Sequence, residues 1–315
     1  MNKFKAMKSV YGYYFPEVRK AIDELFQNYP HDIFHQWCNP GLDDFHVPII
    51  NTYLEFQERS VPNLKNFEFS YPTAGSEEGI REILTWLQSK KVKEIYVLEG
   101  EYEGYKSVAE TRCIKTIEVK STTDPSTLKK GYWFISNPSA RDGNIIPNKY
   151  VQSICEAGHQ VFYDLTYLGL TNFHEFDLSH PNIFAAVASF SKPFGLFSYR
   201  IGFTFSKEEI PSLYGNKWFK SIPALLVANE VMMEINSEDI AKKYKPVQKK
   251  IIDQINKEFE LGMYTSDALL LGHLKEDDAK QLNEVKQKLI EPFKRKNTYR
   301  FCLTPYYQEL EKTIN

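Results

Sequence analysis

Short apolar runs alternate with amphipathic stretches through the middle of the chain. The apolar run FEFSY at 67–71 predicts a strand. After it, Ile80, Ile83 and Leu87 recur at the spacing of one helical face, which predicts a helix at 77–91. The alternation continues with strands at 93–99, 132–136, 160–165, 183–191 and 200–206, and with helices at 104–113 and 146–158. The pattern is one of repeated strand–helix–strand units.

The short connections between these elements indicate how they are arranged. Neighbouring parallel strands need a crossover, and helical crossovers place helices on both faces of a sheet. The run IFAAVASF at 183–190 is almost continuously apolar, which is typical of a strand covered on both faces. We therefore predict an α/β fold with a large domain, in which helices sandwich a mostly parallel sheet, and a smaller α/β domain.

The last third of the chain accounts for the smaller domain. A long charged helix is predicted at 238–260, followed by a strand at 267–274, a helix at 277–293 and a strand at 299–304. The expected organisation is an N-terminal segment that packs with the small domain (1–40), a large domain (41–238), and an interdomain helix with the small C-terminal domain (239–315).

Composition excludes several classes of protein. The 315 residues are 42% hydrophobic and 25% charged with a formal net charge of -2, so the chain can bury a large core and has no basic excess for nucleic acid or an anionic membrane. No stretch has the apolar pattern of a signal peptide or a membrane span. The cysteines form no C-x-x-C pair and the histidines no metal-like cluster. We expect a cytoplasmic protein without a bound metal, a nucleic-acid partner or a membrane partner.

Polar residues of suggestive type lie where predicted strands end, which is where ligands of open α/β sheets bind. The turn PTAGSEEG opens a helix, whose free N–H groups at Ser76 and Glu77 can hold a phosphate. Asn137-Pro138 follows the strand at 132–136 and is, by itself, an ordinary turn starter. Each of these signals is weak alone.

Three charged residues stand at or beside later strand ends. Asp164 is either a helix cap or the partner of a cationic ligand group. Lys192 either forms an ion pair at the domain edge or is a desolvated lysine whose lowered pKa prepares it for a Schiff base. Arg200 lies eight residues later, and its fork geometry fits a phosphate or an ordinary ion pair.

One ligand accounts for this series better than separate structural roles do. It would carry a phosphate for the glycine-containing turn and Arg200, and a basic ring nitrogen for Asp164. It would also carry a ring hydroxyl for Asn137 and an aldehyde for Lys192. Pyridoxal 5'-phosphate has these four groups, and we predict it as the cofactor.

In these motifs the chain resembles the fold-type I pyridoxal-phosphate enzymes, specifically class I and II aminotransferases of the histidinol-phosphate and aspartate aminotransferase kind. The resemblance runs through TAGSEEGI, EGEYEGYKSVAET, ISNPSARDGNIIP, YDLTY and SFSKPFGLFSYRIGF, from about Tyr71 to Phe205. It extends more loosely to Thr304, with a shortened small domain. The spacing from Lys192 to Arg200 is its most specific element.

The resemblance implies catalytic roles for three residues. Lys192 is the Schiff-base lysine, Asp164 pairs with the pyridinium nitrogen, and Tyr102 stacks on the cofactor, with Tyr105 as the reserve. The cofactor-binding residues that it implies are Gly75, Ser76, Glu77, Tyr102, Asn137, Asp164, Tyr167, Ser189, Ser191, Lys192 and Arg200.

For the substrate, the resemblance implies Asn137 and Arg300. Arg300 stands in TYRFCLTP, which resembles the late strand whose arginine clamps the substrate carboxylate. A structural ion pair at Arg300 is the alternative.

The activity implied is that of an aminotransferase in amino acid metabolism, which moves an amino group between an amino acid and a 2-keto acid through the Lys192 Schiff base. A pyridoxal-phosphate lyase or decarboxylase of an amino acid, and a non-catalytic scaffold, are the alternatives. The intact set of Lys192, Asp164, Asn137 and Arg200 argues against the scaffold, because a buried lysine and carboxylate are costly to keep. A homodimer is also implied, in which Tyr53 is a candidate to cross the interface.

Overall fold

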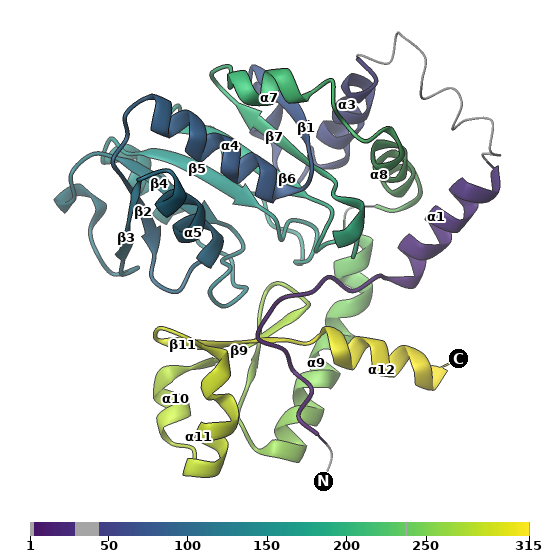
Figure 1. The fold of residues 1–315 in the computed structure, drawn as a ribbon. Coiled ribbons are helices and arrows are strands. Elements are labelled where there is room, and N and C mark those ends of the chain that lie inside the picture. Colours follow the sequence, from purple (N-terminus) through teal and green to yellow (C-terminus); the bar gives the residue numbers. More distant parts are fainter. Residues whose placement is uncertain (1–2, 29–43, 237, 315) are drawn as a thin grey trace.

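The computed structural model describes residues 3–28, 44–236 and 238–314. Its elements form a large domain on a seven-stranded sheet and a small domain on a four-stranded sheet, joined by the long helix α9 (Asp239–Phe259). In Figure 1 the small domain, coloured light green to yellow, lies below the large one, and the N-terminal segment passes between them. Within the described ranges, no helix combines the length and the apolar character that crossing a membrane requires.

The large sheet has the strand order β1-β7-β6-β5-β4-β2-β3. Its strands are β1 (Phe69–Thr73), β2 (Glu94–Leu98), β3 (Lys115–Val119), β4 (Tyr132–Ser136), β5 (Gln160–Leu165), β6 (Ile183–Ser189) and β7 (Gly202–Ser206). The neighbours from β3 to β6 pair in parallel, whereas β7 pairs antiparallel with both β6 and β1. This mostly parallel sheet confirms the predicted α/β class.

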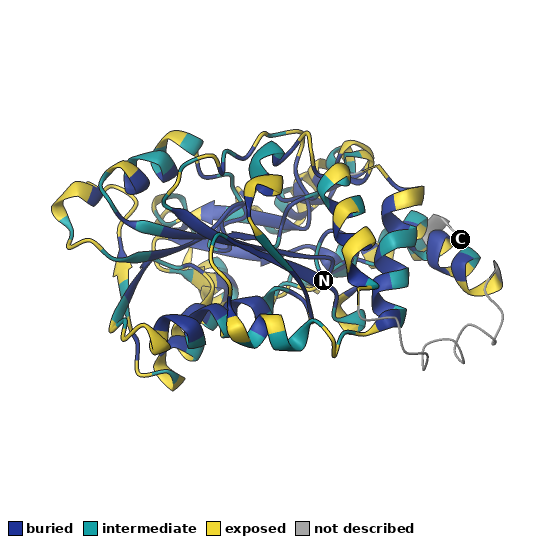
Figure 2. Ribbon diagram, turned by 90° about the horizontal axis from the view of Figure 1, so that it is seen from above, coloured by how far each residue is buried: buried dark blue, intermediate teal, exposed yellow. Residues whose placement is uncertain are grey.

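Helices cover both faces of the sheet because the central strands are apolar on both sides. All of β6 is buried, with Val187 in one apolar cluster and Ala186 in the other. One cluster includes the apolar faces of α4 (Ser76–Ser89), α5 (Glu103–Thr111) and α7 (Pro211–Asn216); the other includes those of α1 (Pro16–Asn28), α3 (His46–Phe56), α6 (Asn148–Glu156) and α8 (Ile222–Glu234). Figure 2 shows the sheet as a buried layer between helices whose outer faces are exposed.

The small domain is a four-stranded sheet in the order β10-β11-β9-β8. Its elements after α9 are β8 (Tyr264–Thr265), β9 (Leu271–Lys275), α10 (Glu276–Lys280), α11 (Glu284–Ile290), β10 (Lys294–Arg295), β11 (Thr298–Cys302) and α12 (Thr304–Ile314). The N-terminal segment lies against this domain: Met7 N donates to Cys302 O at 3.1 Å, and Cys302 N donates to Met7 O at 2.9 Å. The N-terminal segment is thereby held beside the late strand β11.

The sequence pattern predicted most strands of the large sheet but missed the edge strand β3. Strands β4 and β5 have the predicted bounds. Strand β3 was not predicted, because Lys115–Val119 is mostly exposed or half-buried and lacks an apolar run. The predicted helix at 277–293 is divided, because the Asn283 side chain caps a new helix by accepting from Lys286 N at 3.0 Å.

The structure corrects the suggestion that Tyr53 crosses a dimer interface. Tyr53 is 3% exposed, and its ring packs on Phe203 inside the large domain with a centroid separation of 5.0 Å. The boundaries of the three predicted segments stay predictions, and residues 29–40 of the first lie outside the described residues.

Candidate active site

A cavity of about 420 Å³ lies at the carboxyl ends of the large-sheet strands and reaches the small domain. Ten of the predicted site residues line it: Ser76, Glu77, Tyr102, Asp164, Tyr167, Ser189, Ser191, Lys192, Arg200 and Arg300. Residues that are far apart in the sequence meet there because the parallel strands β4, β5 and β6 end at the same edge of the sheet.

One end of the cavity is suited to an anion. Helix α4 begins at Ser76 without a side-chain cap, so its first N–H groups remain available. Arg200 closes this end, with Nη2 donating to Ala74 O at 2.6 Å. Gly75 has a φ of 79°, and a Cβ there would lie 2.8 Å from Arg200 Nη2. Gly75 does not line the cavity, but glycine is what allows Arg200 to approach the turn.

Two hydroxyls lie beside this anion end. Ser189 ends β6 and Ser191 follows it, and both are buried lining residues. Ser191 N donates to Ser189 Oγ at 3.1 Å, which orients the Ser189 hydroxyl while leaving its own proton free to donate.

Asp164 is a buried carboxylate with polar, uncharged partners. Its Oδ2 accepts from the Tyr105 hydroxyl at 2.6 Å, and its Oδ1 accepts from Thr166 N at 2.9 Å and Thr166 Oγ1 at 2.5 Å. Burial raises the pKa of Asp164. A cationic ligand group would offset this cost of burial.

Lys192 is the lysine that lines the cavity. Its Nζ donates to Val10 O and lies 5.4 Å from the centroid of the Phe197 ring. Burial lowers the pKa of Lys192 from 10.5 to about 8, with smaller effects from Arg300 and Arg200 in the same direction. A substantial neutral fraction at slightly alkaline pH is what a Schiff-base nucleophile requires.

Tyr102 and Tyr105 have different positions. The Tyr102 ring lines the cavity, 40% exposed, and its hydroxyl donates to Glu77 Oε2 at 2.9 Å. Tyr105 is fully buried behind it and bonds Asp164. Tyr102 therefore lines the cavity and stays the predicted stacking ring, whereas Tyr105 makes a contact with Asp164 that the sequence did not reveal.

Tyr167 and Asn137 were both predicted to bind the cofactor, but only Tyr167 lines the cavity. Tyr167 lines the cavity, and its hydroxyl makes no hydrogen bond to a described residue. Asn137 is fully buried and does not line the cavity. Its Nδ2 donates to Ile146 O at 2.8 Å and to Tyr163 Oη at 2.7 Å, and its Oδ1 accepts from Ile146 N at 2.9 Å. Asn137 would have to give up these partners to bind a ligand.

Arg300 lies on β11 and reaches the cavity from the small domain. It is 5% exposed, with Nη1 donating to Ala140 O and Nη2 donating to Lys8 O at 3.1 Å. Its Nε has no hydrogen-bond partner among the described residues. A buried guanidinium with an unused donor and no carboxylate partner among those residues favours a ligand carboxylate over the structural ion pair.

The N-terminal segment contributes contacts that the sequence did not reveal. The carbonyl of Val10 accepts from Lys192, and the carbonyl of Lys8 accepts from Arg300. These are backbone acceptors, so no side-chain motif marks them. Arg295 also lines the cavity, and the sequence analysis did not single it out.

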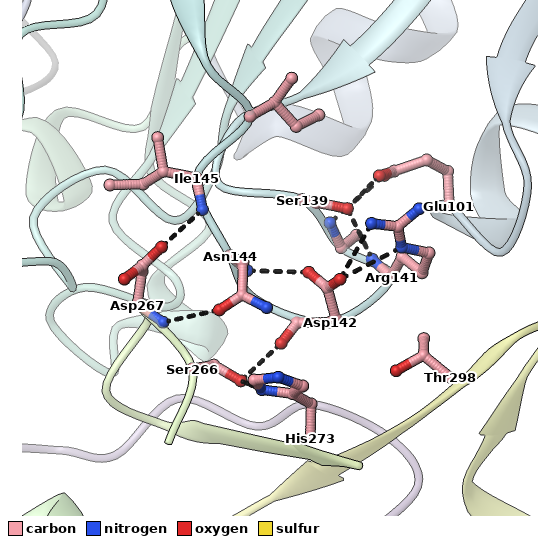
Figure 3. Close-up of polar contacts among 12 residues, drawn as sticks. Glu101, Ser139, Arg141, Asp142, Asn144, Ile145, Ser266, Asp267, His273 and Thr298 are labelled. Carbon is pink, nitrogen blue, oxygen red and sulfur yellow. Dashed lines mark hydrogen bonds and ion pairs between the residues drawn. The ribbon is translucent and has the colours of Figure 1, made fainter. Parts of the chain in front are cut away.

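The chain after Asn137 is fixed by a network that crosses to the small domain, shown in Figure 3. The Ser139 hydroxyl donates to the buried Glu101 carboxylate, while Ser266 Oγ donates to Asp142 O at 2.5 Å. Burial is the main influence on the pKa of Glu101 and raises it. Ser266 Oγ also lies 3.2 Å from Nδ1 of His273 on β9, so this network connects the chain after Asn137 to the small domain.

The cavity as a whole fits pyridoxal phosphate. The uncapped helix α4 and Arg200 suit its phosphate, and the buried Asp164 suits a protonated ring nitrogen. The free Tyr167 hydroxyl suits its ring hydroxyl, and Lys192 suits its aldehyde.

Comparisons with known proteins agree with this geometry. Residues 71–218 match the sequence model of the family described as aminotransferase class I and II. Comparison with curated proteins gave no match.

Solved structures share the fold at low identity. The aspartate aminotransferase from Thermus thermophilus with maleate is 14% identical, with 96% of this chain and 87% of that chain covered and a TM-score of 0.70. The pyridoxal-phosphate-bound C-S lyase from Staphylococcus hominis is 12% identical, with 98% and 90% covered and a TM-score of 0.68. The L-threonine-O-3-phosphate decarboxylase from Porphyromonas gingivalis is 12% identical, with 85% and 88% covered and a TM-score of 0.60.

The chain therefore has the fold of the fold-type I pyridoxal-phosphate enzymes, as its motifs predicted. Within that class, its large domain resembles the class I and II aminotransferases, and the cofactor indicated is pyridoxal 5'-phosphate.

Proposed function

We propose that the protein is a pyridoxal-phosphate-dependent aminotransferase that moves an amino group between an amino acid and a 2-keto acid. The observation that carries this proposal is that Lys192, Asp164 and Arg200 line one cavity from three separate strand ends. A structural ion-pair network would bring opposite charges into contact, but the hydrogen bonds of Asp164 are to uncharged groups among the described residues.

The proposed cofactor contacts follow from the chemistry of each group. Arg200, the N–H groups of Ser76 and Glu77, and the nearby serine hydroxyls would hold the phosphate. The face of the Tyr102 ring would pack on the cofactor ring, and the Tyr167 hydroxyl would bond its oxygen.

When bound, pyridoxal phosphate supplies an aldehyde for the substrate amine and a ring that accepts electrons when a bond to the substrate α-carbon breaks. Asp164 would stabilise positive charge on the ring nitrogen by remaining ionised beside it. Lys192 would take the α-carbon proton onto Nζ and deliver it again, because its lowered pKa suits both proton uptake and release near neutral pH.

Arg300 would bind the α-carboxylate of the amino acid. Its buried position excludes water from the contact, and its fork geometry allows two parallel hydrogen bonds that fix the orientation of the α-carbon. Asn137 stays a predicted contact that depends on a rearrangement of its side chain.

The homodimer and the cytoplasmic location are part of the same proposal and rest on the family resemblance. The similar C-S lyase and decarboxylase show that this fold accommodates reactions other than transamination. A lyase or decarboxylase is therefore the outcome that the experiment must separate from an aminotransferase.

The test is a single-turnover experiment on the protein reconstituted with pyridoxal phosphate. Wild type and Lys192→Ala are mixed with a panel of amino acids in the absence of any keto acid, and the visible spectrum and products are followed. We expect wild type to release a 2-keto acid in an amount equal to the cofactor converted to its amine form, and Lys192→Ala to bind cofactor without covalent attachment.

Other outcomes would contradict the proposal in distinct ways. Release of an amine, carbon dioxide or a thiol with the cofactor unchanged would identify a decarboxylase or lyase. Failure of wild type to bind pyridoxal phosphate at all would leave only the scaffold.

A further inference from the structure

Arg295 is a second arginine in the cavity, and the cofactor contacts proposed above do not use it. It lies on β10 of the small domain and lines the cavity together with Arg300. Its side chain is only 11% exposed. Burial lowers the pKa of Arg295, and the charge of the neighbouring Arg300 lowers it further.

The charges lining the cavity show what Arg295 is available to bind. The cations are Lys192, Arg200, Arg295 and Arg300, and the anions are Glu77, Glu103 and Asp164. The proposed function assigns Lys192, Arg200 and Asp164 to the cofactor and Arg300 to the substrate α-carboxylate. The cation that remains is Arg295.

The present partner of Arg295 is exchangeable. Arg295 Nη1 lies 2.5 Å from Glu103 Oε1, and this is the sole ion pair or hydrogen bond of its guanidinium within residues 3–28, 44–236 and 238–314. Glu103 is 73% exposed in the first turn of α5, so its carboxylate can turn into water at little cost. The buried guanidinium cannot do so, and it would keep unused donors for a second anion.

We propose that Arg295 binds a second anionic group on the side chain of the substrate, either a carboxylate or a phosphate, by displacing Glu103. This inference rests on the proposed function, because it takes Arg300 as the site of the α-carboxylate. It makes acidic amino acids and their keto acids the preferred substrate class.

The competing explanation is that Arg295 only holds the two domains together through its ion pair with Glu103. Lys296 provides the matched control, because it stands next in the chain and pairs with Glu118 of the large domain at 2.8 Å without lining this cavity. Replacing a residue that only joins the domains would change the affinity for ligands of every charge equally. Replacing a residue that binds the second anionic group would lower the affinity for acidic ligands alone.

The experiment is calorimetric titration of the protein reconstituted with pyridoxal phosphate. Succinate is compared with butyrate, which has the same number of carbons and one carboxylate, and O-phosphoserine is compared with serine. Wild type, Arg295→Gln, Lys296→Gln and Glu103→Gln are measured in parallel.

We expect the acidic member of one pair to bind wild type at least tenfold more tightly than its neutral match. Arg295→Gln should lose that preference while keeping its affinity for the neutral ligand, and Lys296→Gln should resemble wild type. Glu103→Gln should bind the acidic ligand several-fold more tightly, because it removes the competing carboxylate. The succinate and phosphoserine arms distinguish a carboxylate from a phosphate.

Equal affinity for both members of each pair, no binding of any ligand, or an equal loss for acidic and neutral ligands in Arg295→Gln would overturn the inference. The proposed function is judged separately by conversion of the cofactor with neutral amino acids. If neutral amino acids are converted and acidic ones are not preferred, the aminotransferase proposal stands and this inference falls.

Discussion

Lys192 and Lys245 are two half-buried lysines with lowered pKa values and different surroundings. Lys192 lines the cavity, whereas Lys245 on α9 donates to Gln248 Oε1 at 3.0 Å and to Ser266 O at 2.8 Å. Burial lowers the pKa of each from 10.5 to about 8. A lowered pKa therefore reports burial of the amine, and the position in the cavity is what distinguishes Lys192.

The free energy of unfolding should depend on the charge of Lys192. Below pH 8 the folded and unfolded chains both carry the charged amine, so the folded state bears the full cost of burying it. Between about 8 and 10.5 the folded amine loses its proton first, and the cost disappears. Lys192→Met should therefore stabilise the cofactor-free protein at pH 7 by on the order of 2 kcal/mol, and by much less near pH 10.

Urea denaturation of wild type and variant at both pH values measures this difference, with Lys245→Met as the control. Lys245→Met should show a similar dependence on pH, but it should still retain pyridoxal phosphate through borohydride reduction, whereas Lys192→Met should not. A stability difference independent of pH would contradict the burial argument.

At the scale of elements, the N-terminal segment and the loop that carries Lys192 are packed backbone to backbone. A Cβ on Gly12 would lie 2.3 Å from Ser191 O and 2.9 Å from Gly195 Cα. The segment also supplies the Val10 carbonyl that Lys192 bonds. The position of Lys192 therefore depends on the segment around Val10, which stands 182 residues earlier in the chain.

Gly12→Ala should displace the loop that carries Lys192. The new Cβ would meet backbone atoms of Ser191 and Gly195, which cannot move aside as a flexible side chain can. We expect a loss of stability of roughly 1–3 kcal/mol and at least tenfold weaker binding of pyridoxal phosphate. Thermal denaturation and cofactor titration measure the two effects.

Gly215→Ala in α7 is the matched control for this change. An added Cβ there would have no atom within 4 Å, so the helix should gain up to about 1 kcal/mol with unchanged cofactor affinity. If Gly12→Ala bound the cofactor as wild type does, the N-terminal segment would have no part in positioning Lys192.

At the scale of the whole molecule, exposed aromatic side chains lie close to the cavity. Phe197 contacts Lys192 and is 53% exposed, and Phe219 is 87% exposed beside Arg200 in a neighbouring cavity. Aromatic side chains this exposed are typical of surfaces that another chain covers. They agree with the homodimer that the family resemblance implies, and they replace Tyr53 as candidates for its interface.

Phe219→Glu should weaken the predicted dimer, because it places a charge in an apolar contact. Sedimentation velocity at micromolar concentrations should show twice the chain mass for wild type and a shift toward the single chain for Phe219→Glu. Val285→Glu on α11 of the small domain, where Val285 is 77% exposed, should remain dimeric. A wild type that sediments as a single chain would refute the homodimer.

The sequence by itself determined the fold class, strands β4 and β5, and the set of strand-end residues that line the cavity. These features are local: apolar runs define buried strands, and parallel strands that end at one edge must bring their following residues together. This reasoning selects Asp164 and Lys192, and the spacing of eight residues from Lys192 adds Arg200.

The tertiary structure alone decided the antiparallel pairing of β7, the burial of the Asn137 amide, and the backbone partners of Lys192 and Arg300. It also decided that Arg295 shares the cavity with Arg300. These contacts either join residues far apart in the chain or use backbone carbonyls, which every residue possesses. No spacing or residue type marks them in the sequence, because they arise from how the two domains and the N-terminal segment pack together.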